Sequence, residues 1–129
     1  MIIDTSAMIA ILFDESDAPK FAVAIAAAEA RRLSAASFVE TALVIETLTK
    51  GAGARHLDAF IRRAGISIEP VTEDQAHIAR QAYADYGKGR HPAALNFGDC
   101  FVYALAKATG EPLLFKGNDF KRTDIVAAL

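Results

Sequence analysis

The sequence predicts an α/β fold in which helices cover both faces of a short-stranded, mostly parallel sheet, giving three α/β/α layers. Short apolar runs alternate along the chain with longer segments of helical periodicity, which is the order of elements in such folds. Capping residues and glycines punctuate these segments at the expected places. A length of 129 residues suits one domain, so we expect a single domain over residues 1–129.

The elements begin with a buried strand that ends in an acid, Ile2-Ile3-Asp4. Thr5 and Ser6 offer an N-cap for a helix over residues 7–13. Pro19 falls near the first turn of a second helix, where its missing N–H group costs nothing. These features predict a strand followed by two helices.

Later helices open with capping patterns, in which a Ser, Thr or Asn precedes an acid or amide by three residues. The remaining elements that we expect are a strand over 33–36, a helix from Ser37 to Lys50, a helix over 54–64, a strand over 66–70, a helix from Thr72 to Tyr86, a helix from Asn96 to Thr109, a strand over 112–115, and a short turn from Asn118 or Asp119.

The composition excludes several classes of protein. Hydrophobic residues make up 53% of the chain, which argues against a disordered protein. The one cysteine, Cys100, rules out an internal disulfide and a cysteine zinc site. A net charge of -2 argues against a protein that coats nucleic acid through charge alone. The apolar N-terminal run contains Asp4 and lacks a basic flank, so we expect a cytoplasmic protein without membrane contact.

Four acids are predicted to meet at one edge of the sheet. Asp4 ends the first strand, Glu40 falls in the first turn of the helix after the second strand, Asp99 opens the helix before the last strand, and Asp119 follows that strand. In a parallel sheet these positions all lie at the carboxyl edge, where ligands usually bind. Singly, Glu40 and Asp99 are equally well explained as capping acids. Asp4 is harder to explain, because burial after two isoleucines costs desolvation.

The set of acids is more informative than any member. Converging carboxylates repel and raise one another's pKa, and a bound hard cation removes that cost. Mg²⁺ favours carboxylates, water and phosphate oxygens. The cluster therefore predicts a divalent-metal site that acts on a phosphoester.

Four segments, in order along the chain, resemble the PIN-domain ribonucleases, and specifically the VapC-like toxins. The segments are Met1-Ile2-Ile3-Asp4-Thr5-Ser6-Ala7, Ser37-Phe38-Val39-Glu40-Thr41, Leu95-Asn96-Phe97-Gly98-Asp99-Cys100, and Leu113-Leu114-Phe115-Lys116-Gly117-Asn118-Asp119-Phe120. The resemblance implies a PIN fold and endoribonuclease activity with Mg²⁺ or Mn²⁺.

The resemblance also implies roles for particular residues. Asp4, Glu40 and Asp99 correspond to acidic residues of the metal site, and Ser6 to a hydroxyl residue that supports the first Asp. Many PIN domains have an acid at the position of Gly117, whereas this chain follows it with Asn118 and Asp119, and we carry over Asp119 as the fourth acid. We expect Asp4 and Asp99 to bind the cation, Glu40 to help, and Glu40 or Asp119 to position a water.

Basic residues precede Asp99 and surround Asp119 in the sequence, and we expect them to bind RNA phosphates. Singly, each is as well explained as solvated surface. They are Lys88, Arg90, His91, Lys116, Lys121 and Arg122. The family likeness further implies a VapB-like antitoxin that reaches an Arg into the acidic pocket, and a homodimer.

Other functions fit the residues less well. A haloacid-dehalogenase phosphatase needs a second Asp two residues after the first, where this chain has Ser6, and a receiver domain needs a pair of acids that Asp4 lacks. A PIN-like scaffold that binds RNA or a partner without cutting is the non-enzyme alternative. The presence of all four acids argues against that scaffold.

Overall fold

A computed structural model describes all residues, 1–129, and contains a parallel sheet of four strands in the order β3-β2-β1-β4. The elements along the chain are β1 (Ile2–Ile3), α1 (Thr5–Leu12), α2 (Ala18–Ala27), β2 (Arg32–Ser34), α3 (Ala35–Thr49), α4 (Ala54–Ala64), β3 (Ser67–Glu69), α5 (Glu73–Tyr86), α6 (Phe97–Thr109), β4 (Leu113–Leu114) and the 3₁₀ turn η1 (Phe120–Arg122).

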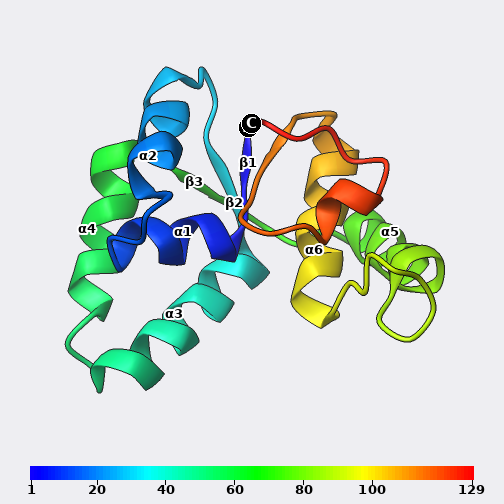
Figure 1. Ribbon diagram of the computed structural model, residues 1–129, viewed down its shortest axis with the longest axis horizontal. Coiled ribbons are helices and arrows are strands. Elements are labelled where there is room, and N and C mark those ends of the chain that lie inside the picture. The colour runs from blue at the N-terminus through cyan, green and yellow to red at the C-terminus, as the bar shows by residue number, and fades with distance from the viewer.

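The sheet lies between two helical layers, as the alternation of strands and helices predicts (Figure 1). Alternate residues of a strand face opposite sides. Accordingly, Ile2 and Leu113 join the buried cluster with α5 and α6, whereas Ile3 and Leu114 join the cluster with α1 to α4. The buried strands β1 and β4 therefore contribute to two apolar cores, one on each face of the sheet, and the predicted α/β/α fold is confirmed.

The carboxyl ends of the neighbouring strands β1 and β4 meet at one edge of the sheet. β1 pairs with β4 through Ile2 opposite Leu113 and Ile3 opposite Leu114. The pairing continues for one more bond, because the N–H of Asp4 donates to the carbonyl of Leu114 at 2.9 Å. Asp4 is thus held directly beside the segment that leads to Asp119.

Two of the predicted helix starts are wrong, and both errors have the same cause. The N-cap of α1 is Asp4, not Thr5 or Ser6, and the N-cap of α3 is Ser34, not Ser37. Each helix begins directly after its strand, and the last strand residue or the acid that follows it supplies the capping oxygen. Thr5 and Ser6 are also good capping residues, and Ser37 has capping-box spacing to Glu40. Local pattern alone therefore placed the two helix starts two or three residues late.

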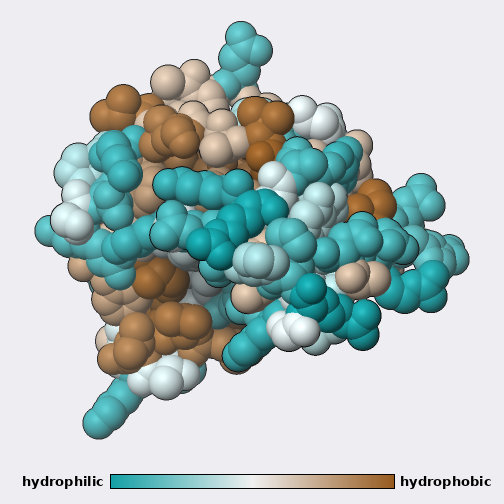
Figure 2. Space-filling view, turned by 45° about the vertical axis from the view of Figure 1, so that its right-hand side comes forward, coloured by the Kyte–Doolittle hydropathy of each residue, from teal (hydrophilic) through white to brown (hydrophobic).

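Apolar side chains also remain on the surface. Figure 2 shows hydrophobic patches divided by a hydrophilic band, and the lower patch lies at the height of α3 and the start of α6 in Figure 1. On α3, Val39, Leu43 and Leu48 are 52%, 63% and 63% exposed. No helix combines the length and apolar character that crossing a bilayer requires.

Candidate metal centre

Asp4 is a buried carboxylate, with only 5% of the residue exposed. It follows two fully buried isoleucines, and burial is the main reason that its pKa lies above the usual value, with repulsion from Glu40 adding to the effect. The N–H and the hydroxyl of Ser6 both donate to Oδ2, at 3.0 and 2.5 Å. Oδ1 therefore keeps its lone pairs for another ligand.

Ser6 joins Asp4 to the segment after β4. Its Oγ donates to Asp4 and also accepts a hydrogen bond from the N–H of Lys116 at 2.9 Å. Because one hydroxyl makes both bonds, it fixes the rotamer of Asp4 relative to the segment that carries Asp119. This arrangement agrees with the supporting role expected for Ser6.

Glu40 lies one turn deeper in its helix than predicted. Since α3 begins at Ala35, Glu40 is in its second turn and makes no capping box with Ser37. Ser37 is buried instead, and its carbonyl accepts from the hydroxyls of Thr41 (2.8 Å) and Thr5 (3.4 Å). The capping explanation of Glu40 is therefore excluded, which leaves this half-buried acid without a structural role in its own helix.

The hydroxyls of Thr5 and Thr41 are positioning groups that the sequence analysis missed. Thr41 also donates to Thr5 at 3.4 Å, and both side chains are buried. Their bonds tie the start of α1 to α3, and so fix Asp4 relative to Glu40. The available signal was their position directly after each acid in the chain.

Asp99 caps α6 and also has a strongly raised pKa. Its N–H and carboxylate complete a capping box with Asn96, as predicted. Burial raises the pKa of Asp99 to about 6, and repulsion from Asp4, Asp119 and Glu40 contributes to the rise, while the bond from the Asn96 N–H opposes it. The predicted acids are thus close enough to interact through their charges.

Gly98 brings Glu40 next to Asp99. A Cβ atom at Gly98 would lie 2.1 Å from Oε2 of Glu40, a distance that no real contact allows. Gly98 is the second residue of α6, and glycine is a poorer helix former than alanine. The missing side chain therefore leaves space for the Glu40 carboxylate at the cost of helix stability.

Asp119 is the most exposed of the acids. It occupies the N-cap position of η1 but makes no side-chain capping bond. Asp119 raises the pKa of Asp99, so it belongs to the same electrostatic cluster. An exposed acid at the mouth of the cluster is suited to act on water or substrate.

The oxygen atoms of these acids are of the type that binds a divalent cation, although the side chains are too far apart to coordinate one ion together. No three His, Cys, Asp or Glu side chains are close enough to hold a metal ion as they stand. Without a cation the carboxylates repel one another, which contributes to the raised pKa of Asp99, and a bound cation would compensate their charge. Free oxygens on Asp4 and Asp99, and the space at Gly98 for Glu40, are the features that suit a hard ion with oxygen ligands.

A Gly98→Ala substitution tests the placement of Glu40. The added methyl group displaces the Glu40 carboxylate, which is the far end of a flexible side chain. We expect the helix to gain stability or stay unchanged, while affinity for Mn²⁺ falls by about 10-fold. Calorimetry on Gly98→Ala, Glu40→Gln and the double variant gives the measurement. Because both changes act through Glu40, the double variant should bind Mn²⁺ about as tightly as the single variant that has the lower affinity. If the losses of affinity in the two single variants add up in the double variant, the placement of Glu40 beside Gly98 is contradicted.

The loop between α5 and α6 carries the first group of predicted RNA contacts. Lys88 and Arg90 are exposed. His91 is half-buried, stacks edge-on against Tyr86 at 5.1 Å, and accepts a hydrogen bond at Nδ1 from the Ala93 N–H. One ring nitrogen of His91 thus stabilises the loop, and the two cations remain exposed to solvent.

The second basic group lies around η1. Lys121 and Arg122 are exposed, and Arg122 donates to the carbonyl of Pro92 at 3.3 Å. That bond brings the two basic segments side by side. Lys116 instead pairs with Glu15 at 2.6 Å and Asp17 at 3.6 Å, so its charge is already neutralised within the protein.

The chain has close relatives of similar length. The PIN domain pattern matches residues 1–126. Ribonuclease VapC30 of Mycobacterium tuberculosis is 55% identical over 125 residues, which cover 97% of this chain and 95% of the relative. Ribonuclease VapC of Mycolicibacterium smegmatis is 54% identical over 127 residues, covering 98% of each chain.

Solved structures share the fold at much lower identity. VapC20 of Mycobacterium tuberculosis, described as a sarcin-ricin loop cleaving toxin, superposes with a TM-score of 0.78 at 17% identity and covers 97% of this chain and 95% of its own. A toxin–antitoxin complex from Klebsiella pneumoniae gives a TM-score of 0.70 at 18% identity, covering 99% and 97%. With an edge of interacting carboxylates, a matching domain pattern and relatives of more than half identity, the chain belongs to the PIN-domain family and, within it, to the VapC ribonucleases.

Proposed function

We propose that this protein is a divalent-metal-dependent endoribonuclease, the toxin of a VapBC-type toxin–antitoxin pair. The single observation that carries the proposal is the electrostatic interaction of Asp99 with Asp4, Glu40 and Asp119 at one edge of the sheet. Such a cluster is costly without a cation, and a phosphodiester substrate fits a cation held by carboxylates. The VapC ribonucleases that the chain resembles support RNA as the substrate.

Each acid has a proposed part in the reaction. Asp4 and Asp99 would hold Mg²⁺ or Mn²⁺ with help from Glu40, and the hydrogen bonds from Ser6 would keep Asp4 in place for this role. The ion, when bound, neutralises phosphate charge and lowers the pKa of water. Asp119 or Glu40 orients the attacking water and accepts its proton. Hydrolysis by water requires no RNA 2′-hydroxyl. By likeness to the PIN-domain ribonucleases, we expect the P–O3′ bond to break, which leaves 5′-phosphate and 3′-hydroxyl ends.

The exposed cations beside the site are proposed to hold the RNA backbone. They are Lys88 and Arg90 in the loop between α5 and α6, and Lys121 and Arg122 in η1, all four of them exposed. The hydrogen bond from Arg122 to the Pro92 carbonyl holds the two segments next to each other, so that one RNA strand could contact cations of both. His91 and Lys116 have internal partners, so we assign them a smaller share of this binding than the sequence suggests.

Protein partners are also proposed. A VapB-like antitoxin would insert an Arg among the carboxylates in place of the cation, and the toxin–antitoxin complex with the same fold supports such a partner. A homodimer is a further proposal. Exposed apolar residues on α3, namely Val39, Leu43 and Leu48, provide surface that a partner could bury.

The proposal is tested by incubating the protein with a mixture of transfer and ribosomal RNA, with Mg²⁺ or Mn²⁺ and with EDTA. We expect cleavage only with the metal, and sequencing of the fragments to find 5′-phosphate ends. The alternative, a catalytically inactive scaffold, predicts intact RNA in every condition. Cleavage that continues in EDTA would contradict a metal-dependent mechanism.

A further inference from the structure

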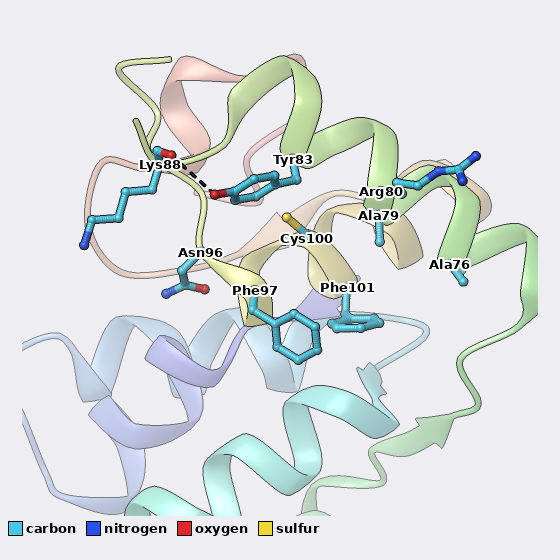
Figure 3. Close-up of a pocket in the computed structure, with 9 residues that line it drawn as sticks. All are labelled: Ala76, Ala79, Arg80, Tyr83, Lys88, Asn96, Phe97, Cys100 and Phe101. Carbon is cyan, nitrogen blue, oxygen red and sulfur yellow. Dashed lines mark hydrogen bonds between the residues drawn. The ribbon is translucent and has the colours of Figure 1, made fainter. Parts of the chain in front are cut away.

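A hollow of about 610 Å³ lies between α5 and α6, outside the acid cluster (Figure 3). Ala76 and Ala79 on α5 have small side chains there, which leaves room opposite the aromatic side chains of α6. The volume is in the range of small-molecule sites. The hollow is therefore large enough for an aromatic base.

Its walls are aromatic and unusually open to solvent. Phe97 is 80% exposed and Tyr83 is 42% exposed. The ring centres of Phe97 and Phe101 are 4.9 Å apart in an edge-to-face arrangement. One face of the Phe97 ring is therefore left for another group to stack on. The Tyr83 ring lies against Gly87, where an added Cβ would be 2.8 Å from it, and the Tyr83 hydroxyl donates to the Lys88 carbonyl at 3.5 Å (Figure 3).

The rim is positively charged. Arg80 and Lys88 line the hollow, and the Arg90 guanidinium lies 5.5 Å from the centre of the Tyr83 ring. All three are exposed, and none forms a salt bridge. Arg90 thus covers one face of the Tyr83 ring, while Phe97 is open to solvent. Aromatic rings beside cations without acidic partners are the pattern with which proteins bind single-stranded nucleic acid.

The hollow adjoins the acid cluster. Asn96 lines it, and the N–H of Asn96 donates to the carboxylate of Asp99 at 3.0 Å. Phe97 and Asp99 lie in the same first turn of α6, and a helix with its side chains is only about 10 Å across. A strand whose phosphate is at the carboxylates can therefore place a neighbouring base in the hollow.

We propose that this hollow binds one unpaired nucleobase of the RNA, close to the cleaved bond, by stacking it on Phe97 and Tyr83. The inference rests on the proposed ribonuclease function and adds a specificity site to it. A second copy of the chain fits this face less well. A two-fold contact here would bring the same cations, Arg80, Lys88 and Arg90, against each other.

The test compares a short oligoadenylate with an abasic ribose-phosphate strand of the same length and charge. Fluorescence anisotropy in EDTA measures binding without cleavage. We expect the wild type to bind the oligoadenylate about 10-fold more tightly, Phe97→Ala to remove most of that difference, and Phe97→Tyr to retain it. Val126→Ala, which also truncates an exposed apolar residue, is the matched control and should bind like the wild type.

Equal binding of the two strands by the wild type would overturn the inference, as would a preference that survives Phe97→Ala. If Phe97→Ala instead changes the molecular mass measured by light scattering and leaves the preference intact, the face is a contact between copies. Cleavage with metal is measured separately on the wild type. Failure of the base site with cleavage intact is thus distinguishable from failure of the ribonuclease function.

Discussion

Asp4→Asn should reduce metal-dependent RNA cleavage by at least about 100-fold while the protein remains folded. Asp4 supplies a buried carboxylate whose Oδ2 is already engaged by Ser6. An Asn at this position keeps the oxygen that caps α1, since Asn and Asp are comparable N-caps. It removes the negative charge that would hold a cation. Gel analysis of RNA fragments with Mn²⁺ gives the rate.

The control for this variant is Asp58→Asn, which alters an exposed acid on α4. We expect that variant to cleave at the wild-type rate. Circular dichroism of Asp4→Asn should match that of the wild type. Wild-type cleavage by a folded Asp4→Asn protein would contradict the proposed role of Asp4.

Asp99→Asn should reduce RNA cleavage about as much as Asp4→Asn does. Unlike most substitutions at a buried site, it should also stabilise the metal-free protein. A pKa of about 6 against an ordinary 3.8 means that folding disfavours the charged form. Asn removes that charge yet retains an oxygen to accept from Asn96. After allowance for solvent screening, we expect a gain of about 1–2 kcal/mol in the free energy of unfolding near neutral pH.

The pH dependence follows from the direction of the shift. The pKa of Asp99 is higher in the folded than in the unfolded chain, so the folded state holds the proton more tightly. This group therefore lowers stability progressively as the pH rises from about 4 to about 6, and the loss persists above that range. Urea unfolding in EDTA across this range should show the wild type and Asp99→Asn converging at acid pH. A gap that is constant with pH would contradict this origin.

The sheet edge was predictable from sequence because strand order and chain direction constrain it strongly. The carboxyl end of each parallel strand and the N-terminus of each packed helix lie on one side, so Asp4, Glu40, Asp99 and Asp119 could be assigned there without coordinates. The capping box of Asn96 and Asp99 was also predicted correctly, because it involves only residues that are three positions apart in the chain.

Tertiary contacts determined what the sequence pattern could not show. Ser37 and Glu40 have capping-box spacing, but α3 begins directly after β2 with Ser34 as its N-cap, and the Ser37 carbonyl accepts hydrogen bonds from Thr5 and Thr41 instead. The pairing of Lys116 with Glu15 and Asp17 joins segments about a hundred residues apart, as their bond shows. The space for Glu40 at Gly98 depends on how α3 packs on α6. None of these contacts is encoded by local spacing.

The central claim is that carboxylates distant in sequence share a divalent ion, and calorimetric titration of Mn²⁺ into the metal-free protein tests it most directly. We predict saturable uptake by the wild type, with affinity lowered by at least about 10-fold in Asp4→Asn and in Asp99→Asn, and unchanged in Asp58→Asn. Uptake of equal affinity in all four proteins, or none in the wild type, would contradict the claim.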